Sequence, residues 1–153
     1  MGQYHIIINL DKHQYLHPQN CGDGMKMAEF GDSSEGTLSA LTMLLACNDG
    51  QGGGDYCIPD PLTGSWAGDR IVIAGDYTDP ARFIVDKDGN PDPKIAELAF
   101  KKNFSLADVS IYSLAQALFE NISDRVIGAF KTHREDHSLA SINLNEKGWR
   151  TRK

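Results

Sequence analysis

The chain has 153 residues and a formal net charge of −6, from 15 Lys and Arg against 21 Asp and Glu. A chain of this length buries about 70% of the surface that its unfolded form exposes, so one core can be stable without metals or disulfides. General nucleic-acid binders and membrane-surface binders present a basic footprint, and this composition argues against both classes. We expect one domain over residues 1–142.

Cysteine usage and the N-terminus indicate the compartment. Cys21, Cys47 and Cys57 match neither a CxxC redox pair nor a zinc ribbon, and free thiols fit a reducing cytoplasm. The N-terminus lacks the cationic start and apolar core of a signal peptide. No apolar stretch approaches the roughly 18 residues that cross a bilayer. The sequence therefore predicts a cytoplasmic protein with no membrane partner.

The first 47 residues alternate short apolar runs with turn residues. Residues 4–10 are β-branched and residues 13–17 form a second run, so the pair predicts an N-terminal hairpin. Residues 25–30 are expected to form a third strand. Residues 37–47 carry leucines at helical spacing, which indicates a mostly buried helix.

Strand signals return only after a long irregular segment. Residues 48–66 are rich in Gly, Asp and Pro and show no periodicity, which is typical of a long loop. Residues 69–76 predict a strand through three successive β-branched residues. Residues 83–85 are expected to form another strand, because the turn sequence Asp88-Gly89 follows them.

The C-terminal half has helical patterns. Pro93 is well placed to start a helix over residues 94–102, and an apolar stripe over residues 111–122 continues past a candidate cap at Ser123. Residues 143–153 are polar and predict a loosely held basic tail. Strands followed by helices indicate an α+β fold, with an N-terminal antiparallel sheet and one buried helix before a C-terminal helical segment.

Glycines 50, 52, 53 and 54 form a run that could cradle an anion with its backbone amides. The run follows a helix and lacks the Gly-Lys-Ser/Thr ending of a phosphate-binding loop, and aspartates flank it. A surface connection is the favoured interpretation.

Two segments resemble metal sites and fail part of the pattern. Residues 86–92 place oxygen side chains as calcium loops do, but Pro91 occupies the position of the required glycine, so we expect a turn. His133 and His137 have the spacing of zinc ligands on a helix, but Arg134 replaces the glutamate of the zinc-protease pattern. The sequence predicts no metal and no cofactor, and a zinc site made by these histidines and a cysteine is the alternative.

Polar and aromatic side chains gather around the predicted strand 69–76. Successive strand residues point to opposite faces, so Asp69 and Arg70 are not expected to pair with each other. If Arg70 faces a groove, it can bind a carboxylate or phosphate; if it faces the edge of the core, it pairs with Asp76 or another acid. Both interpretations stay open. The candidate ligand- or partner-binding residues are Asp55, Trp66, Asp69, Arg70, Asp76 and Tyr77.

Several segments resemble a family of small bacterial and phage proteins that has no established activity. The segments are Met1-Gly2-Gln3-Tyr4, Asn9-Leu10-Asp11-Lys12, Gly52-Gly53-Gly54-Asp55 and the run GSWAGDRIVIAGDY over residues 64–77. The resemblance covers the N-terminal half of the chain well and extends weakly to residues 121–126. It implies an accessory role, in the host-cell cytoplasm if a phage encodes the protein, and an anti-defence function as a hypothesis. It assigns no catalytic residue.

Two functions from different classes follow. The first is a non-enzymatic accessory protein that occupies a host protein or nucleoprotein through an acidic surface. Nine aspartates and only three cations lie between Asp49 and Asp92, so this segment is the expected surface. The alternative is an enzyme or sensor for a nucleotide-like small molecule, with His5, His13 and His17 as acid–base groups beside the candidate pocket.

Overall fold

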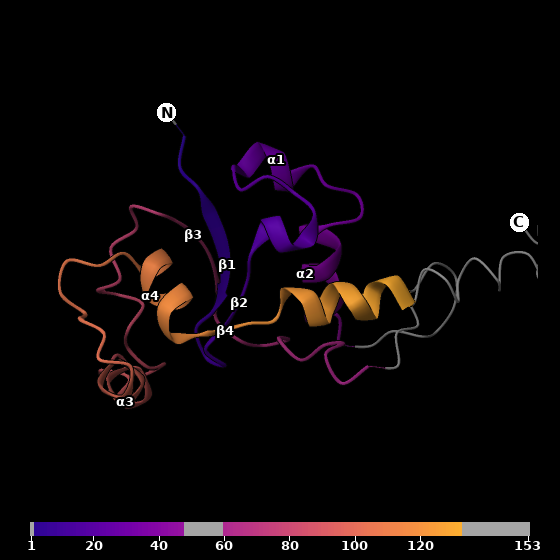
Figure 1. Ribbon diagram of the computed structural model, residues 1–153. Helices are drawn as coiled ribbons and strands as arrows, with labels where there is room; N and C mark the ends of the chain where they lie inside the picture. The colour runs from indigo at the N-terminus through magenta and orange to yellow at the C-terminus, as the bar shows by residue number, and fades with distance from the viewer. Residues whose placement is uncertain (1, 48–59, 133–153) are drawn as a thin grey trace, which may run out of the picture.

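The computed structural model describes residues 2–47 and 60–132. Four strands, β1 (His5–Asn9), β2 (Gln14–Leu16), β3 (Ile71–Gly75) and β4 (Glu120–Asn121), form one sheet in the order β3-β1-β2-β4 (Figure 1). The predicted α+β class is confirmed. The sheet is mixed rather than purely antiparallel, because β4 runs parallel to β2. β4 has two exposed polar residues, which give no strand signal in a sequence.

The central strand β1 is buried on both faces. Ile6, Ile7 and Ile8 are fully buried, with Ile6 and Ile8 in one apolar cluster and Ile7 in a second. Side chains at alternate strand positions point to opposite faces, so the sheet separates two cores. Each buried isoleucine contributes about 1.5–3 kcal/mol to stability.

Helices cover the two faces of the sheet. On the face of Ile6 and Ile8 lie α3 (Pro93–Lys101) and α4 (Ile111–Leu118). On the face of Ile7 lie α1 (Met27–Gly31), α2 (Thr37–Leu45) and a helix over residues 123–132. Figure 1 shows these two groups on opposite sides of β1, which gives three layers.

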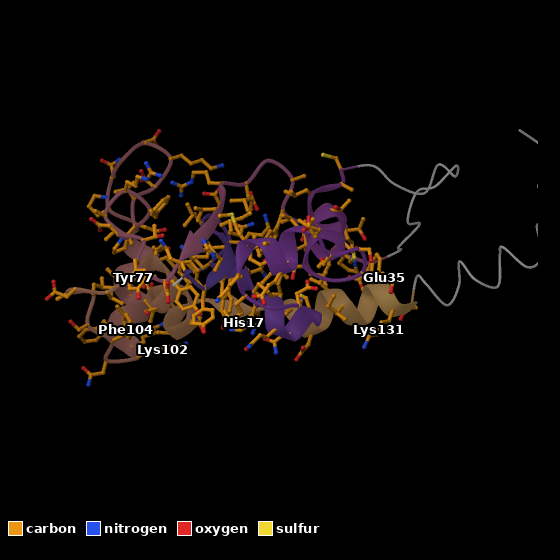
Figure 2. All side chains as sticks on the ribbon, turned by 90° about the horizontal axis from the view of Figure 1, so that it is seen from above. His17, Glu35, Tyr77, Lys102, Phe104 and Lys131 are labelled. Carbon is orange, nitrogen blue, oxygen red and sulfur yellow. The ribbon has the colours of Figure 1, made fainter. Side chains whose placement is uncertain are left out.

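The predicted hairpin and helices are present. A short 3₁₀ helix, η1 (Pro18–Cys21), follows the hairpin. Asp92 caps α3 by accepting from Lys94 N at 2.9 Å, and Pro93 occupies its first turn as expected. The chain is extended at Phe119 and turns helical again at Ser123. The predicted cap at Ser123 is wrong, because Ser123 Oγ accepts from His17 N at 2.7 Å, whereas Asn121 Oδ1 accepts from Ser123 N at 3.0 Å. Figure 2 places Lys131, near the end of this last helix, and Tyr77 at opposite ends of the molecule.

Two strand predictions are wrong. Residues 27–30 of the predicted strand 25–30 belong to α1, because the Glu29 side chain accepts from Lys26 N at 3.0 Å and stabilises a helical turn there. Residues 83–85 fold as a turn, in which Phe83 N and Ile84 N both donate to Pro80 O. They make only an isolated bridge to Pro91. In both segments local hydrogen bonds outweigh strand propensity.

Some expectations fall on residues that the structure does not describe. The glycine-rich run, Cys57 and the tail over residues 143–153 lie outside the described residues, so the domain boundary at residue 142 stays a prediction. Among the described residues, no helix has the length and apolar character needed to cross a membrane.

Asn9 organises the hairpin turn from a fully buried position. Its Oδ1 accepts from Asp11 N at 2.9 Å and from Lys12 N at 2.8 Å, and its Nδ2 donates to Asp69 Oδ2 at 2.9 Å. The turn also carries His13 in the left-handed region, at φ 55°. The side chain of Asn9 therefore joins the turn to the segment before β3.

We expect Asn9→Ala to lower the free energy of unfolding by about 1–3 kcal/mol, because it leaves two backbone donors without an acceptor. Urea denaturation followed by circular dichroism measures the change. Asn90→Ala is the control, since Asn90 is exposed and its side chain has no described bond. Equal stability of the two variants would contradict this role of Asn9.

Candidate functional site

The structure separates the predicted site residues along β3. Asp69 and Arg70 precede the strand, whereas Asp76 and Tyr77 follow it. At roughly 3.3 Å per residue, Arg70 and Asp76 are about 20 Å apart along the chain. They do not share one pocket. Asp55 lies outside the described residues.

Arg70 is an ion-pair partner of Asp11. Its Nε donates to Asp11 Oδ1 at 2.8 Å, its backbone N donates to Asp11 Oδ2 at 2.9 Å, and one terminal nitrogen donates to Val85 O at 3.0 Å. Of the two interpretations of Arg70, the structure supports pairing with an acid, and that acid is Asp11 rather than Asp76. The guanidinium ties the hairpin turn to the loop after β3.

Burial raises the pKa of Asp11, but the hydrogen bonds from Arg70 and the charges of Arg70 and Lys87 outweigh it and hold the pKa below its ordinary value. The carboxylate is thus ionised at neutral pH and held by its cations.

Trp66 and Asp69 are structural. Trp66 is fully buried in the core on the face of Ile7, and its Nε1 donates to Gln14 Oε1 at 2.8 Å. Its ring is therefore covered by protein and presents no surface for stacking. Asp69 Oδ2 accepts from Asn9 and from Lys12 Nζ, at 2.9 and 2.6 Å. As expected, Asp69 does not pair with Arg70.

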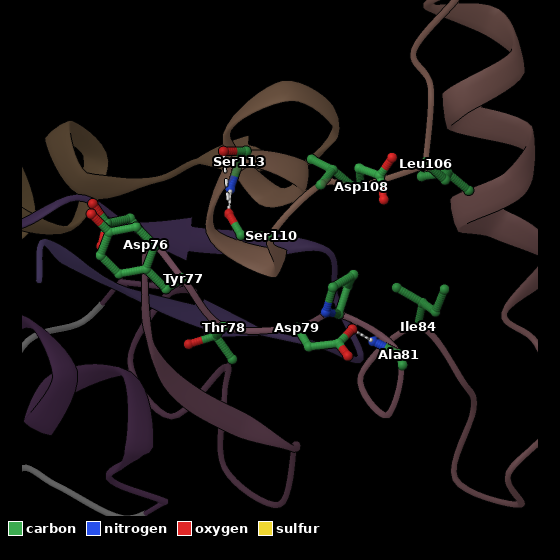
Figure 3. A pocket seen from close by; sticks show the side chains of 12 residues that line it. Asp76, Tyr77, Thr78, Asp79, Ala81, Ile84, Leu106, Asp108, Ser110 and Ser113 are labelled. Atoms are coloured by element: carbon green, nitrogen blue, oxygen red, sulfur yellow. Dashed lines mark hydrogen bonds between the residues drawn. The ribbon is translucent and has the colours of Figure 1, made fainter.

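Asp76 and Tyr77 line an open cleft of about 700 Å³ (Figure 3). Residues 76–81 and Ile84 form one wall, and residues between Leu106 and Ser113 form the other. Tyr77 is 80% exposed, so its ring is available to a ligand. Figure 3 shows Ser110 and Ser113 on the α4 side of the cleft and, on the other wall, the Asp79 carboxylate, whose Oδ1 accepts from Ala81 N at 2.9 Å.

The cleft is acidic. Asp76, Asp79 and Asp108 line it, and none of the described residues that line it is Lys, Arg or His. Asp108 is at φ 53°, a left-handed conformation that Asp and Asn adopt more readily than most residues. The sequence indicated an acidic segment but missed Asp108 and the serines, because they lie 30 residues further along the chain.

Asp76 has a free oxygen inside the cleft wall. Its Oδ1 is buried and has no hydrogen-bond partner among the described residues. Burial raises the pKa of Tyr112, and the nearby Asp76 carboxylate and Tyr4 raise it further. Asp76 therefore lies close to aromatic side chains, and its carboxyl group adds to the acidic lining of the cleft.

The histidines do not assemble at this cleft. His13 Nε2 lies 2.9 Å from Asp92 Oδ2, and the His13 ring packs edge-on against Phe119 at 4.9 Å between centroids. Burial lowers the pKa of His17. His5, His13 and His17 are absent from the residues that line the cleft. They therefore supply no acid–base group there.

No group of three or more described His, Cys, Asp or Glu residues could hold a metal ion. In the segment over residues 86–92, which resembles part of a calcium-binding loop, Asp86 Oδ1 accepts from Asp88 N and Asn90 N, both at 2.9 Å, and closes a turn. The turn predicted there is confirmed. His133 and His137 lie outside the described residues.

Comparisons with models of protein families, with curated proteins and with solved structures find no match to this chain.

We expect Asp11→Asn to cost about 1.5–3 kcal/mol at pH 7, because it removes hydrogen bonds to a charged group. The Asp11 pKa is lower in the folded state, so its contribution is complete above the ordinary aspartate pKa of about 4 and is lost as the pH falls through the folded value. The stability difference between the two proteins should therefore shrink below pH 4. Urea titrations from pH 7 to about pH 3 measure it, and a constant difference would exclude the Arg70–Asp11 pair as its source.

Proposed function

We infer that the protein is a non-enzymatic accessory binding protein, which holds a basic segment of a partner protein in the acid-lined cleft. The observation that carries this proposal is the composition of the cleft: three aspartates, an exposed tyrosine and no cation among its described lining residues. Such a lining attracts Lys and Arg side chains and repels anions.

The geometry favours a side-chain ligand. Asp79 and Asp108 approach from different segments of the chain, and Asp76 adds a third acid to the lining at the end of β3. Arginine carries five N–H donors in a planar fork, which can satisfy separate carboxylates at once. Tyr77 supplies an exposed aromatic face beside these acids, where a cation gains a further attraction.

The nucleotide alternative has less support. Arg70 is already paired with Asp11, and Trp66 is buried, so neither offers a contact to phosphate or base. The cleft aspartates would repel a phosphate group at short range. This alternative would rest on the glycine-rich run, which lies outside the described residues.

The resemblance to small bacterial and phage proteins sets the proposed context. An acidic protein that covers the basic surface of a host protein or nucleoprotein would compete with its nucleic acid, and this is one physical route to inhibiting a host defence protein. We place this action in the cytoplasm of the host cell. Association of this kind depends on ionic strength, because the charges are near the surface.

The test uses a labelled oligoarginine peptide and fluorescence anisotropy. We expect binding at low salt that weakens as salt rises, and about a five- to tenfold loss of affinity in Asp79→Asn/Asp108→Asn, since each exposed charge pair contributes up to about 1 kcal/mol. Asn keeps the left-handed backbone at position 108.

The matched control is Asp32→Asn/Asp88→Asn, which removes the same charge from exposed positions outside the cleft. It should bind like the unmodified protein. Equal losses in both double variants would mean that the peptide responds to net charge alone, and the cleft would then not be the site.

Tyr77→Ala probes the aromatic part of the cleft. We expect an unchanged melting temperature, because the side chain is 80% exposed, and about a two- to fivefold weaker affinity for oligoarginine from the lost cation–π contact. Differential scanning calorimetry and anisotropy measure the two quantities. An unchanged affinity would remove Tyr77 from the site.

A further inference from the structure

The hydrogen-bond pattern between β1 and β3 shows which backbone groups of β3 point away from the sheet. Leu10 N donates to Arg70 O, and Asp76 N donates to Tyr4 O, each at 2.9 Å. In an antiparallel pair the hydrogen-bonded residues alternate, so Val72 and Ala74 bond to β1. Ile71 and Ile73 therefore direct their N–H and C=O groups outward.

Among the described residues, β3 is an edge strand and its outward backbone groups have no hydrogen-bond partner. It is the terminal strand in the order β3-β1-β2-β4, and no described residue makes a hydrogen bond to the backbone of Ile71 or Ile73 outside the ladder. The Ile73 side chain is 45% exposed. A free, apolar edge of this kind is a template for pairing with another extended segment.

The cleft lies at the end of this edge and on one face of it. Asp76 and Tyr77 follow β3 directly and line the cleft. Val72 packs in the same cluster as Ile84 and Leu106, which also line the cleft, whereas Ile71 packs on the opposite face. A strand added beside β3 would place alternate side chains on the cleft face and on the Ile73 face.

We propose that the partner segment binds as an extended strand along the free edge of β3, with alternate basic side chains on the cleft face and apolar side chains beside Ile73. This inference rests on the proposed function and names the form and pattern of the basic ligand. Backbone hydrogen bonds pair the segment with β3, and its alternating side chains determine the specificity, as in other cases of strand addition.

Charge favours a basic segment over a second copy of the chain. Each copy carries a net charge of −6, and Arg70, the cation beside β3, is already held by Asp11. Two copies paired through β3 would bring like-charged molecules together, whereas a basic segment would be attracted by the aspartates that follow the strand.

The experiment compares peptides of the repeating sequence Arg-Val, in which either the arginine or the valine nitrogens are methylated. Methylation removes backbone donors from only one edge of an extended peptide. If the peptide pairs with β3, one methylated form should bind about tenfold more weakly and the other should keep the affinity of the unmodified peptide, because each lost hydrogen bond has a modest cost that adds along the strand. Fluorescence anisotropy with the full chain measures the affinity of the unmodified peptide and of both methylated forms.

Backbone amide exchange locates the contact. Ile71 and Ile73 amides should exchange rapidly in the free protein and slow down when the unmodified peptide binds, whereas the Val72 and Ala74 amides should be protected in both states. The Asp79→Asn/Asp108→Asn variant provides the comparison. It should have a lower affinity for the peptide, and its amide exchange without peptide should match that of the unmodified protein.

The outcomes separate the two proposals. If neither this peptide nor oligoarginine binds, the proposed function fails. If all three peptides bind equally, the cleft binds basic groups but pairing along β3 is excluded. If the protein self-associates as its concentration rises and the Ile73 amide is protected without peptide, the edge is occupied by a second copy and the inference is overturned.

Discussion

Burial of β1 on both faces is the constraint on which the rest of the structure depends. Ile6 and Ile8 on one face and Ile7 on the other are inaccessible to water, so helices must cover both sides of the sheet. The strand cannot slip by one residue without exchanging these two sets of side chains. Every other element is placed by this requirement: α3 and α4 on one face, and α1, α2 and the helix over residues 123–132 on the other.

A small polar network complements that apolar centre where β1 ends. The Asn9 side chain makes hydrogen bonds to the hairpin turn and to Asp69. Asp11 forms an ion pair with Arg70, and Arg70 also donates to Val85 O. The polar groups before β3 are thus occupied by structural bonds. The acids after β3 are different, because Asp76 and Asp79 line an open cleft. One strand therefore has a structural end and an end that is available to a ligand.

Position within the sheet gives β3 two properties that act together. As the terminal strand it has backbone groups at Ile71 and Ile73 that no described residue pairs with, and the residues that follow it line the acidic cleft. Backbone pairing is independent of the partner's sequence, whereas the cleft selects for positive charge. A ligand that uses both features would be extended and alternately basic and apolar. The absence of a cation among the described cleft residues and the occupied state of Arg70 point to the same ligand chemistry.

Sequence patterns predicted the hairpin, a strand that contains Ile71–Gly75, the helices that begin near residues 37, 94 and 111, and the acidic character of the central segment. Each of these follows from local periodicity, turn residues or composition, which act between near neighbours. Three relations depend on the folded chain: Trp66 is a core residue, Arg70 pairs with Asp11, and Asp108 lines the same cleft as Asp76. These relations join residues 30 to 60 positions apart, so burial and pairing across the sheet fix them.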